Sequence, residues 1–100
     1  MTENGFTVRE QGVFGVSGRL TFQTVPQFLA HTDKFLQHIA STVTIDMHGV
    51  TLADSAGLAL MIEWLQQARA AKHEMVFTNL PEQMRDLIRV NGLTQVFQLK

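Results

Sequence analysis

Apolar and polar residues alternate, or nearly alternate, in two short stretches at the beginning of the chain. These stretches are "FTVRE" and "VFGVSG", and the "QG" between them is a turn signal. Alternation with a period of two places successive side chains on opposite faces of a strand. The first 18 residues therefore predict two short strands joined as a hairpin.

The spacing of apolar residues then becomes helical. Apolar residues and one threonine recur at three- and four-residue steps, at Val25, Phe28, Leu29, Thr32, Phe35, Leu36 and Ile39. Thr24 is a suitable N-cap, and Pro26 stands in the first turn, where a proline leaves no helix hydrogen bond unmade. We expect a helix with one buried face.

Strand and helix signals alternate along the remainder of the chain. Three segments predict strands, namely "TVTIDM" at 42–47, "EMVFTN" at 74–79 and "QVFQL" at 95–99. A second helix is expected from Gly57 to about Ala71. Pro81 opens a third helix, whose apolar stripe is Met84, Leu87 and Ile88 and which Gly92 terminates.

The predicted order of elements is β-β-α-β-α-β-α-β, in one domain that covers residues 1–100. Strands that alternate with helices are typical of an α/β fold with helical crossovers, and the leading hairpin makes the sheet mixed. A chain of 100 residues is long enough for one hydrophobic core and too short for two independent ones.

Composition and charge exclude several classes of function. Hydrophobic residues make up 45% of the chain and charged residues 17%, which is typical of a globular protein. The net charge is -1 and no basic run follows a phosphate backbone, so we expect no nucleic-acid binding. The absence of cysteine excludes thiol catalysis and thiolate metal sites. We find no signal peptide and no run of 18 apolar residues, and expect a soluble protein without direct membrane insertion.

The four histidines do not form a recognisable metal or acid-base motif. His31 and His38 share a face of the first helix and are expected to be solvated, while His48 follows the central strand and His73 ends the second helix. No ligand spacing such as His-Glu-x-x-His occurs. The glycines of residues 12–18 lie inside the predicted hairpin and not between a strand and a helix, so they do not predict a phosphate loop. We expect neither a metal nor a cofactor.

The stretch "DSAGLAL", residues 54–60, marks the beginning of the second helix. Asp54 or Ser55 is its natural N-cap. The N-terminus of a helix presents free amide donors, so the hydroxyl of Ser55 is also placed to be phosphorylated or to contact a partner. No Gly-x-Ser-x-Gly elbow surrounds Ser55, and we do not expect a nucleophile or an enzyme.

Apolar residues of this second helix cover an arc of about 200°, roughly twice what one-sided packing requires. Leu60 and Trp64 occupy one edge of the arc. Two interpretations remain open: this edge is an exposed anchor for a partner, or neighbouring helices cover it.

The segment "IDMHGVTLADSAGLALMIEW", residues 45–64, resembles the central strand, loop and helix of STAS domains, the fold shared by sulfate-transporter tails and anti-sigma factor antagonists. The residues that match the family pattern are Asp46, Gly49, Val50, Asp54, Ser55, Gly57 and Leu58. The predicted order of elements is similar to that of STAS domains over the whole chain. The resemblance implies a single STAS domain, whose members act through protein partners.

Two functions compete within this family. In anti-sigma factor antagonists, the serine that matches Ser55 is phosphorylated by an anti-sigma factor kinase, and the unphosphorylated form captures that kinase. Their tip usually carries a second serine before the glycine and often a glycine after Gly-Leu. This chain has Ala56 and Ala59 at those positions.

The tip "DSAGLALMI" is more similar to that of the small cytoplasmic STAS subunit of Mla-type phospholipid-trafficking ABC transporters, which maintain outer-membrane lipid asymmetry. This resemblance implies a subunit that binds the ATPase subunit and supports its activity, held at the inner membrane through the complex. Asp54, Ser55, Ala56 and Gly57 would then form the contact, which Leu60 or Trp64 would extend. We favour this function over the anti-sigma alternative.

Overall fold

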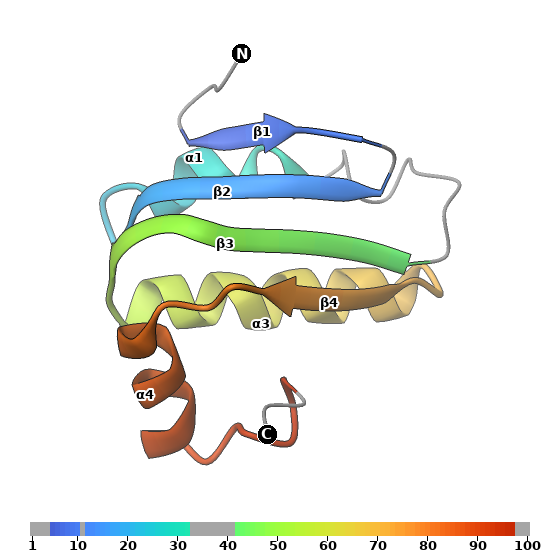
Figure 1. Ribbon diagram of the computed structural model, residues 1–100. Helices are drawn as coiled ribbons and strands as arrows, with labels where there is room; N and C mark the ends of the chain where they lie inside the picture. The colour runs from blue at the N-terminus through green and yellow to red at the C-terminus, as the bar shows by residue number, and fades with distance from the viewer. Residues whose placement is uncertain (1–4, 11, 33–41, 98–100) are drawn as a thin grey trace.

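A mixed four-stranded sheet forms the centre of the computed structural model, which describes residues 5–10, 12–32 and 42–97 (Figure 1). In the order β1-β2-β3-β4, the strands are β1 (Phe6–Val8), β2 (Val13–Leu20), β3 (Thr42–Ala53) and β4 (Glu74–Thr78). β1 pairs antiparallel with β2, whereas β2, β3 and β4 run parallel to one another. The predicted leading hairpin and mixed sheet are confirmed.

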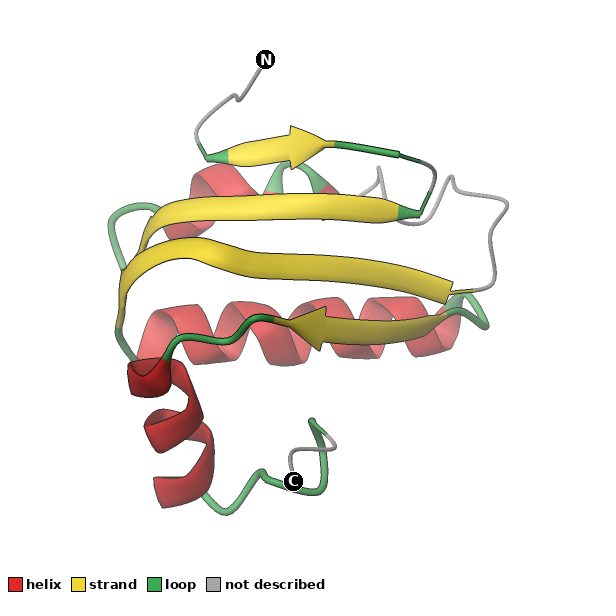
Figure 2. Cartoon of the chain, viewed as in Figure 1, coloured by secondary structure: helices red, strands yellow, loops and turns green. Residues whose placement is uncertain are grey.

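Helices cover one face of this sheet. α1 (Val25–Leu29) and α3 (Ser55–Ala70) lie together on that face, and α4 (Glu82–Val90) lies by the β4 edge (Figure 2). The order of elements agrees with the prediction as far as α4. The described residues of the expected last strand, 95–97, form turns, and residues 98 and 99 lie outside the described part.

Burial alternates along β3 as it does in a strand with one covered face. Val43, Ile45 and Met47 are buried in the core, whereas Thr44 and Asp46 between them face the side of the sheet that the helices leave open. The strand is 12 residues long, twice the predicted length. The prediction stopped at Met47 because the alternation is lost around Gly49, where the pairing with β2 shifts its register between Gly15 and Ser17.

One hydrophobic core fills the space between the sheet and the helices. Its largest fully buried side chains are Trp64, Phe14, Phe28, Leu20, Ile45, Met47, Leu60, Met61, Met84, Ile88 and Val16. They come from β2, β3 and all the described helices, so the elements are joined in a single packed unit.

The first predicted helix is interrupted after five residues. α1 ends at Leu29, a turn follows at residues 30–31, and Thr32 is again helical. His31 was expected to be solvated, but it is only 7% exposed and stacks on Phe6, with ring centroids 4.5 Å apart. The turn that closes α1 places the imidazole over the sheet edge. His38 and the remainder of the predicted helix lie outside the described residues.

The ends of the helices follow the expected signals only in part. Thr24 occupies the N-cap position of α1, but its hydroxyl donates to the carbonyl of Arg19 (2.6 Å) and accepts from the amide of Thr21 (3.0 Å) instead of capping the helix. α4 begins directly after Pro81, and Gly92 follows it with φ +70°. No helix in the described part of the chain is long and apolar enough to cross a membrane.

Candidate functional site

The candidate site lies where the parallel strands end. The carboxyl ends of β2, β3 and β4 meet at one edge of the sheet, at the left of Figure 1, and each is followed there by the start of a helix. This edge is the usual place for binding sites in α/β sheets. The "DSAGLAL" stretch therefore occupies a position from which side chains of several elements reach the same surface.

Asp54 is the N-cap of α3. Its Oδ1 accepts hydrogen bonds from the backbone amides of Ala56 (2.8 Å) and Gly57 (3.3 Å). Its Oδ2 accepts a third bond, from the amide of Phe22 in the loop between β2 and α1 (3.1 Å). Of the two predicted caps, the structure selects Asp54, and the same carboxylate also fastens the neighbouring loop.

These hydrogen bonds favour the ionised form of the Asp54 carboxylate. The amide of Phe22, followed by those of Gly57 and Ala56, lowers the pKa of Asp54 below its ordinary value. Because three amides are aimed at its two oxygens, the side chain is held in place and does not face outward as a free acid. Asp54 therefore positions the tip, and the adjacent Ser55 is the residue that faces solvent.

Gly57 lets α3 approach β2 closely. A Cβ at this position would lie 2.6 Å from the carbonyl oxygen and 2.9 Å from the Cβ of Leu20, and 3.4 Å from the Cβ of Ala53. The amide of Asp54 also donates to the Leu20 carbonyl (3.1 Å). This close approach fixes where the first turn of α3 sits on the sheet.

Ser55 is the outward-facing residue of the tip. It is the first residue of α3 and is exposed, and its hydroxyl has no hydrogen-bond partner among the described residues. Ala59 is exposed one helical turn later, while Ala56 is half-buried. The polar atom presented by the tip is therefore the Ser55 hydroxyl, next to small side chains that leave it accessible.

An exposed aromatic residue that the sequence interpretation missed lies beside the tip. Phe22 is 80% exposed, and with Leu52 (40% exposed) and Asp54 it lines an open groove of about 570 Å³. Gln83 of α4 lines the other side and accepts a hydrogen bond from the Ala53 amide (3.0 Å). The only sequence signal was a phenylalanine inside the polar turn "TFQT" between a strand and a helix.

Leu60 and Trp64 do not belong to this surface. Leu60 is 2% exposed and Trp64 is fully buried, and the Trp64 Nε1 donates to the hydroxyl of Thr32 (3.0 Å). α1 and the sheet cover the edge of α3 that carries them. The expectation that they extend a partner contact was wrong, because the wide apolar arc of α3 packs against the sheet, α1 and α4.

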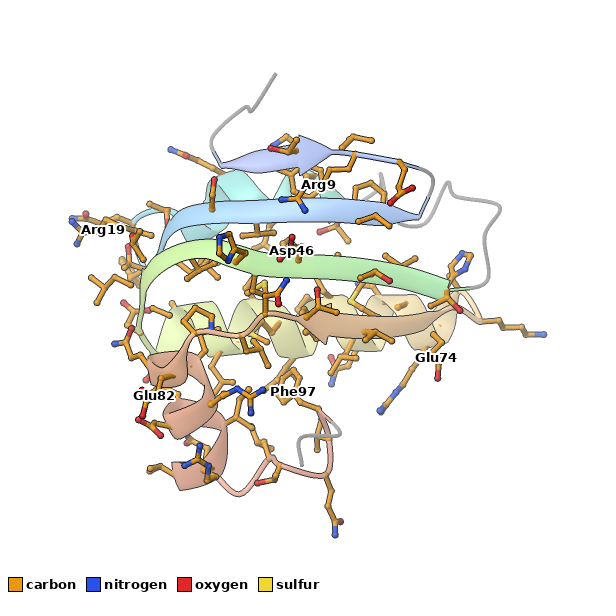
Figure 3. All side chains as sticks on the ribbon, in the orientation of Figure 1. Arg9, Arg19, Asp46, Glu74, Glu82 and Phe97 are labelled. Carbon is orange, nitrogen blue, oxygen red and sulfur yellow. The ribbon has the colours of Figure 1, made fainter. Side chains whose placement is uncertain are left out.

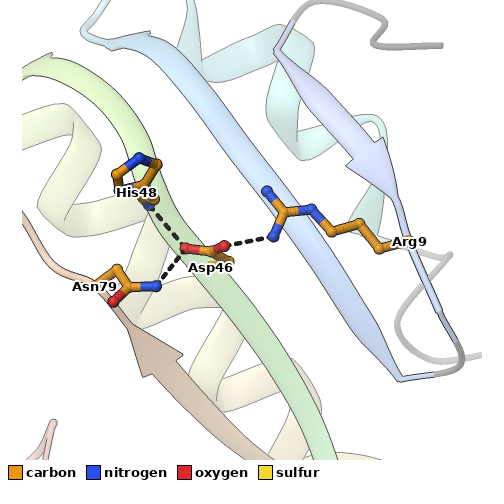
Figure 4. A network of polar contacts seen from close by, with 4 residues as sticks. All are labelled: Arg9, Asp46, His48 and Asn79. Atoms are coloured by element: carbon orange, nitrogen blue, oxygen red, sulfur yellow. Dashed lines mark hydrogen bonds and ion pairs between the residues drawn. The ribbon is translucent and has the colours of Figure 1, made fainter.

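A separate polar network lies on the open face of the sheet (Figure 4). Asp46 forms an ion pair with Arg9 and accepts hydrogen bonds from the Asn79 side chain (3.0 Å) and the His48 amide (2.9 Å). The Asn79 hydrogen bond is the largest of the effects that lower the pKa of Asp46 to about 2. The network ties the end of the first hairpin to β3 and to the loop after β4.

Gly15 makes room for this network. It pairs with Asp46 in the parallel register of β2 and β3, and a Cβ added to it would lie 2.7 Å from the Arg9 guanidinium. Arg9 therefore crosses over β2 at a residue without a side chain (Figure 3). Sequence patterning gave no reason to pair Arg9 with Asp46, since 37 positions separate them.

Among the described residues, the histidine that the sequence places nearest to Ser55 does not reach it. His48 is exposed on β3 and precedes Asp54 by six residues, about 20 Å along an extended strand. It is therefore too distant to serve as a base for Ser55. Within the described residues, no three metal-ligating side chains come together.

Comparison with known proteins agrees with this architecture. A family model described as "Mlab, STAS domain" matches residues 7–99. The chain belongs to the STAS domain family. No curated protein matches it significantly.

Solved STAS-like structures share the fold at low sequence identity. The phosphorylated form of the Bacillus cell fate determinant SpoIIAA superposes with a TM-score of 0.67 at 19% identity, over 90% of this chain and 84% of that one. The unphosphorylated anti-sigma factor antagonist SpoIIAA gives 0.64 at 18%, over 84% and 79%. A sulfate transporter family protein from Wolinella succinogenes gives 0.71 at 13%, over 91% and 75%. The fold class is confirmed as a single SpoIIAA-like α/β domain.

Proposed function

We propose that this STAS domain is a non-catalytic subunit that binds the ATPase subunit of a phospholipid-trafficking ABC transporter through the tip of α3. The observation that carries the proposal is the exposed Ser55 on a tip that Asp54 and Gly57 hold rigid. A rigid tip loses little conformational freedom when a partner binds it. The family model that matches the chain carries the Mlab description, which supports this partner over others.

The surroundings of Ser55 suit a protein contact. Phe22 is exposed and donates its backbone amide to the Asp54 carboxylate, next to Ser55 in the chain, and Leu52 adds apolar area in the same groove. Aromatic side chains surrounded by polar groups are common anchors of protein interfaces. On this proposal the domain resides on the cytoplasmic face of the inner membrane, where the ATPase subunit holds it.

The alternative function is that of an anti-sigma factor antagonist regulated by phosphorylation of Ser55. The exposed Ser55 hydroxyl, which has no hydrogen-bond partner in the described part of the chain, favours it, because a kinase needs that access. The ionised Asp54 carboxylate next to it opposes a phosphate group through like-charge repulsion, whereas the amide donors of the helix N-terminus attract one. The two electrostatic effects on a phosphate at Ser55 have opposite signs and do not discriminate between the two functions. Identification of the binding partner does.

Co-purification from native membranes tests the proposal. The tagged chain is expected to recover an ABC ATPase, and Ser55→Arg to lose it, because a bulky cation is placed at the contact. Gln66→Arg is the matched control, since Gln66 is exposed on the same helix about 16 Å away. Recovery of a soluble kinase-like protein that phosphorylates Ser55, with no ATPase present, would establish the alternative instead.

A further inference from the structure

A second cavity lies on the side of the molecule where β4, α3 and α4 meet, away from the tip groove. Its volume is about 480 Å³, and it is lined by the end of α3, by β4 and its following loop, by Arg85 of α4 and by the turn at Val96 and Phe97. We call it the β4 cavity. Figure 3 shows Phe97 below β4 on the α4 side, and Glu74 at the beginning of the same strand. Its volume is within the range of small-molecule sites.

One wall of the β4 cavity is apolar. Leu65 and Met75 are buried below it, and the rings of Phe77 and Phe97 pack edge to face with centroids 5.6 Å apart. A hydrocarbon or aromatic body placed against these side chains would be removed from water.

The rim of the same cavity carries unpaired positive charge. Arg69, from the last turn of α3, and Arg85, from α4, both line it, and neither forms an ion pair within the described part of the chain. Glu74 is the one acidic residue among the lining residues. The lining thus has a net charge of about +1 in a protein whose overall net charge is -1.

His73 adds a further unsatisfied group. Its Nδ1 is shielded from solvent and has no hydrogen-bond partner among the described residues, and the residue lines the same cavity. Buried polar atoms without partners are uncommon in native proteins, and an absent ligand or water is one ordinary explanation.

We propose that the β4 cavity binds a small amphiphilic anion, with its phosphate or carboxylate between Arg69 and Arg85 and its apolar body against Phe77 and Phe97. Guanidinium groups bind both oxyanions through charge-assisted hydrogen bonds. The apolar wall adds affinity for a ligand that also carries a hydrocarbon or aromatic body, because binding removes that body from water. This site is separate from the tip and does not depend on the ATPase proposal.

Titration calorimetry of the full chain tests the site with four probes below their micelle concentrations. Octyl phosphate and octanoate are expected to bind at least tenfold more tightly than inorganic phosphate, which lacks the apolar body, and than octyl glucoside, which lacks the charge. The preferred head group then distinguishes a phosphate source from a carboxylate source. Equal binding of octyl glucoside, equal binding of inorganic phosphate, or no binding of either amphiphile would overturn the proposal.

Variants locate the site. Arg69→Gln and Arg85→Gln are each expected to weaken binding of the preferred amphiphile about tenfold, and added salt to weaken it further. Arg89→Gln is the control, because Arg89 lies on the same helix, pairs with Asp86 and does not line the cavity. All three arginines are exposed, so the fold is expected to be unaffected. Amide chemical shifts that move only at the tip groove, or equal loss in Arg89→Gln, would place the ligand elsewhere and contradict the assignment.

Discussion

Asp46→Asn is expected to destabilise the domain by about 1–2 kcal/mol at neutral pH. The Asn79 hydrogen bond, the His48 amide and Arg9 lower the pKa of Asp46 from 3.8 to about 2. This difference corresponds to at most about 2.4 kcal/mol in favour of the folded state. Solvent screens part of it, because the Arg9 side chain is 45% exposed and that of Asp46 15%.

The sign of the pH dependence follows from the direction of the shift. A carboxylate whose pKa is lower in the folded state stabilises it fully above the unfolded pKa of 3.8, and this contribution disappears as the pH falls towards about 2. The stability difference between the native protein and Asp46→Asn should therefore be constant from pH 7 to about 5. It should shrink steadily between about pH 4 and 2.

Urea unfolding followed by fluorescence measures this difference, because Trp64 is the single tryptophan and is fully buried. Asp86→Asn is the matched control, since Asp86 pairs with Arg89 on the surface of α4 and both side chains are more than half exposed. The control should lose less than about 0.5 kcal/mol. An equal loss in both variants, or a difference that grows towards acid pH, would refute the reasoning.

Three further variants test the tip and the core. Gly57→Val should lower the free energy of unfolding in urea by about 2–3 kcal/mol, because the valine side chain meets the Leu20 backbone. Ala59→Val, on the exposed face of the same helix, should lower it by less than about 1 kcal/mol. Equal losses in the two variants would contradict the steric explanation. Trp64→Phe should lower the free energy of unfolding by about 1–2 kcal/mol and leave ATPase binding unchanged, because the indole is buried. A loss of affinity for the ATPase without a loss of stability would show that Trp64 belongs to the interface. Phe22→Ala should leave unfolding within about 0.5 kcal/mol and weaken ATPase binding at least tenfold, and unchanged affinity would exclude the ring as an anchor.

The local signals in the sequence were sufficient for most of the fold. The Asp-Ser pair before an apolar run marked the start of α3, Pro81 and Gly92 marked both ends of α4, and alternation marked the leading hairpin. Each of these signals acts through backbone conformation or capping within a few residues. Such effects do not depend on which distant segments the chain packs against.

Features that depend on distant contacts could not be predicted. Trp64 is covered by α1 as well as by the sheet, and His31 is placed over Phe6 by a turn that interrupts a periodic helix. The hydrophobic pattern of a helix indicates how wide its apolar face is, but not how many neighbouring elements cover that face. Arg9 reaches Asp46 only because β2 and β3 are adjacent, a pairing that alternation alone does not specify.

The start of α3 was predictable as the centre of the candidate site, but the residues that surround it were not. Asp54 is one of the two caps that the sequence offered, and Ser55 is exposed beside it. Gly57 makes the close contact with the end of β2. The loop of Phe22 joins them through a hydrogen bond to Asp54, which requires the end of β2 to lie beside the end of β3. Phe22 lies at the site because β2 and β3 are neighbours in the sheet, and the spacing of apolar residues does not predict which strands are neighbours.

The most direct test of the central claim is the affinity of the purified chain for the purified ATPase subunit of the transporter. We predict a saturable complex that Ser55→Arg weakens at least tenfold and that Gln66→Arg leaves unchanged. No complex at any attainable concentration, or a complex of equal affinity in Ser55→Arg, would contradict the account of the α3 tip as the partner-binding surface.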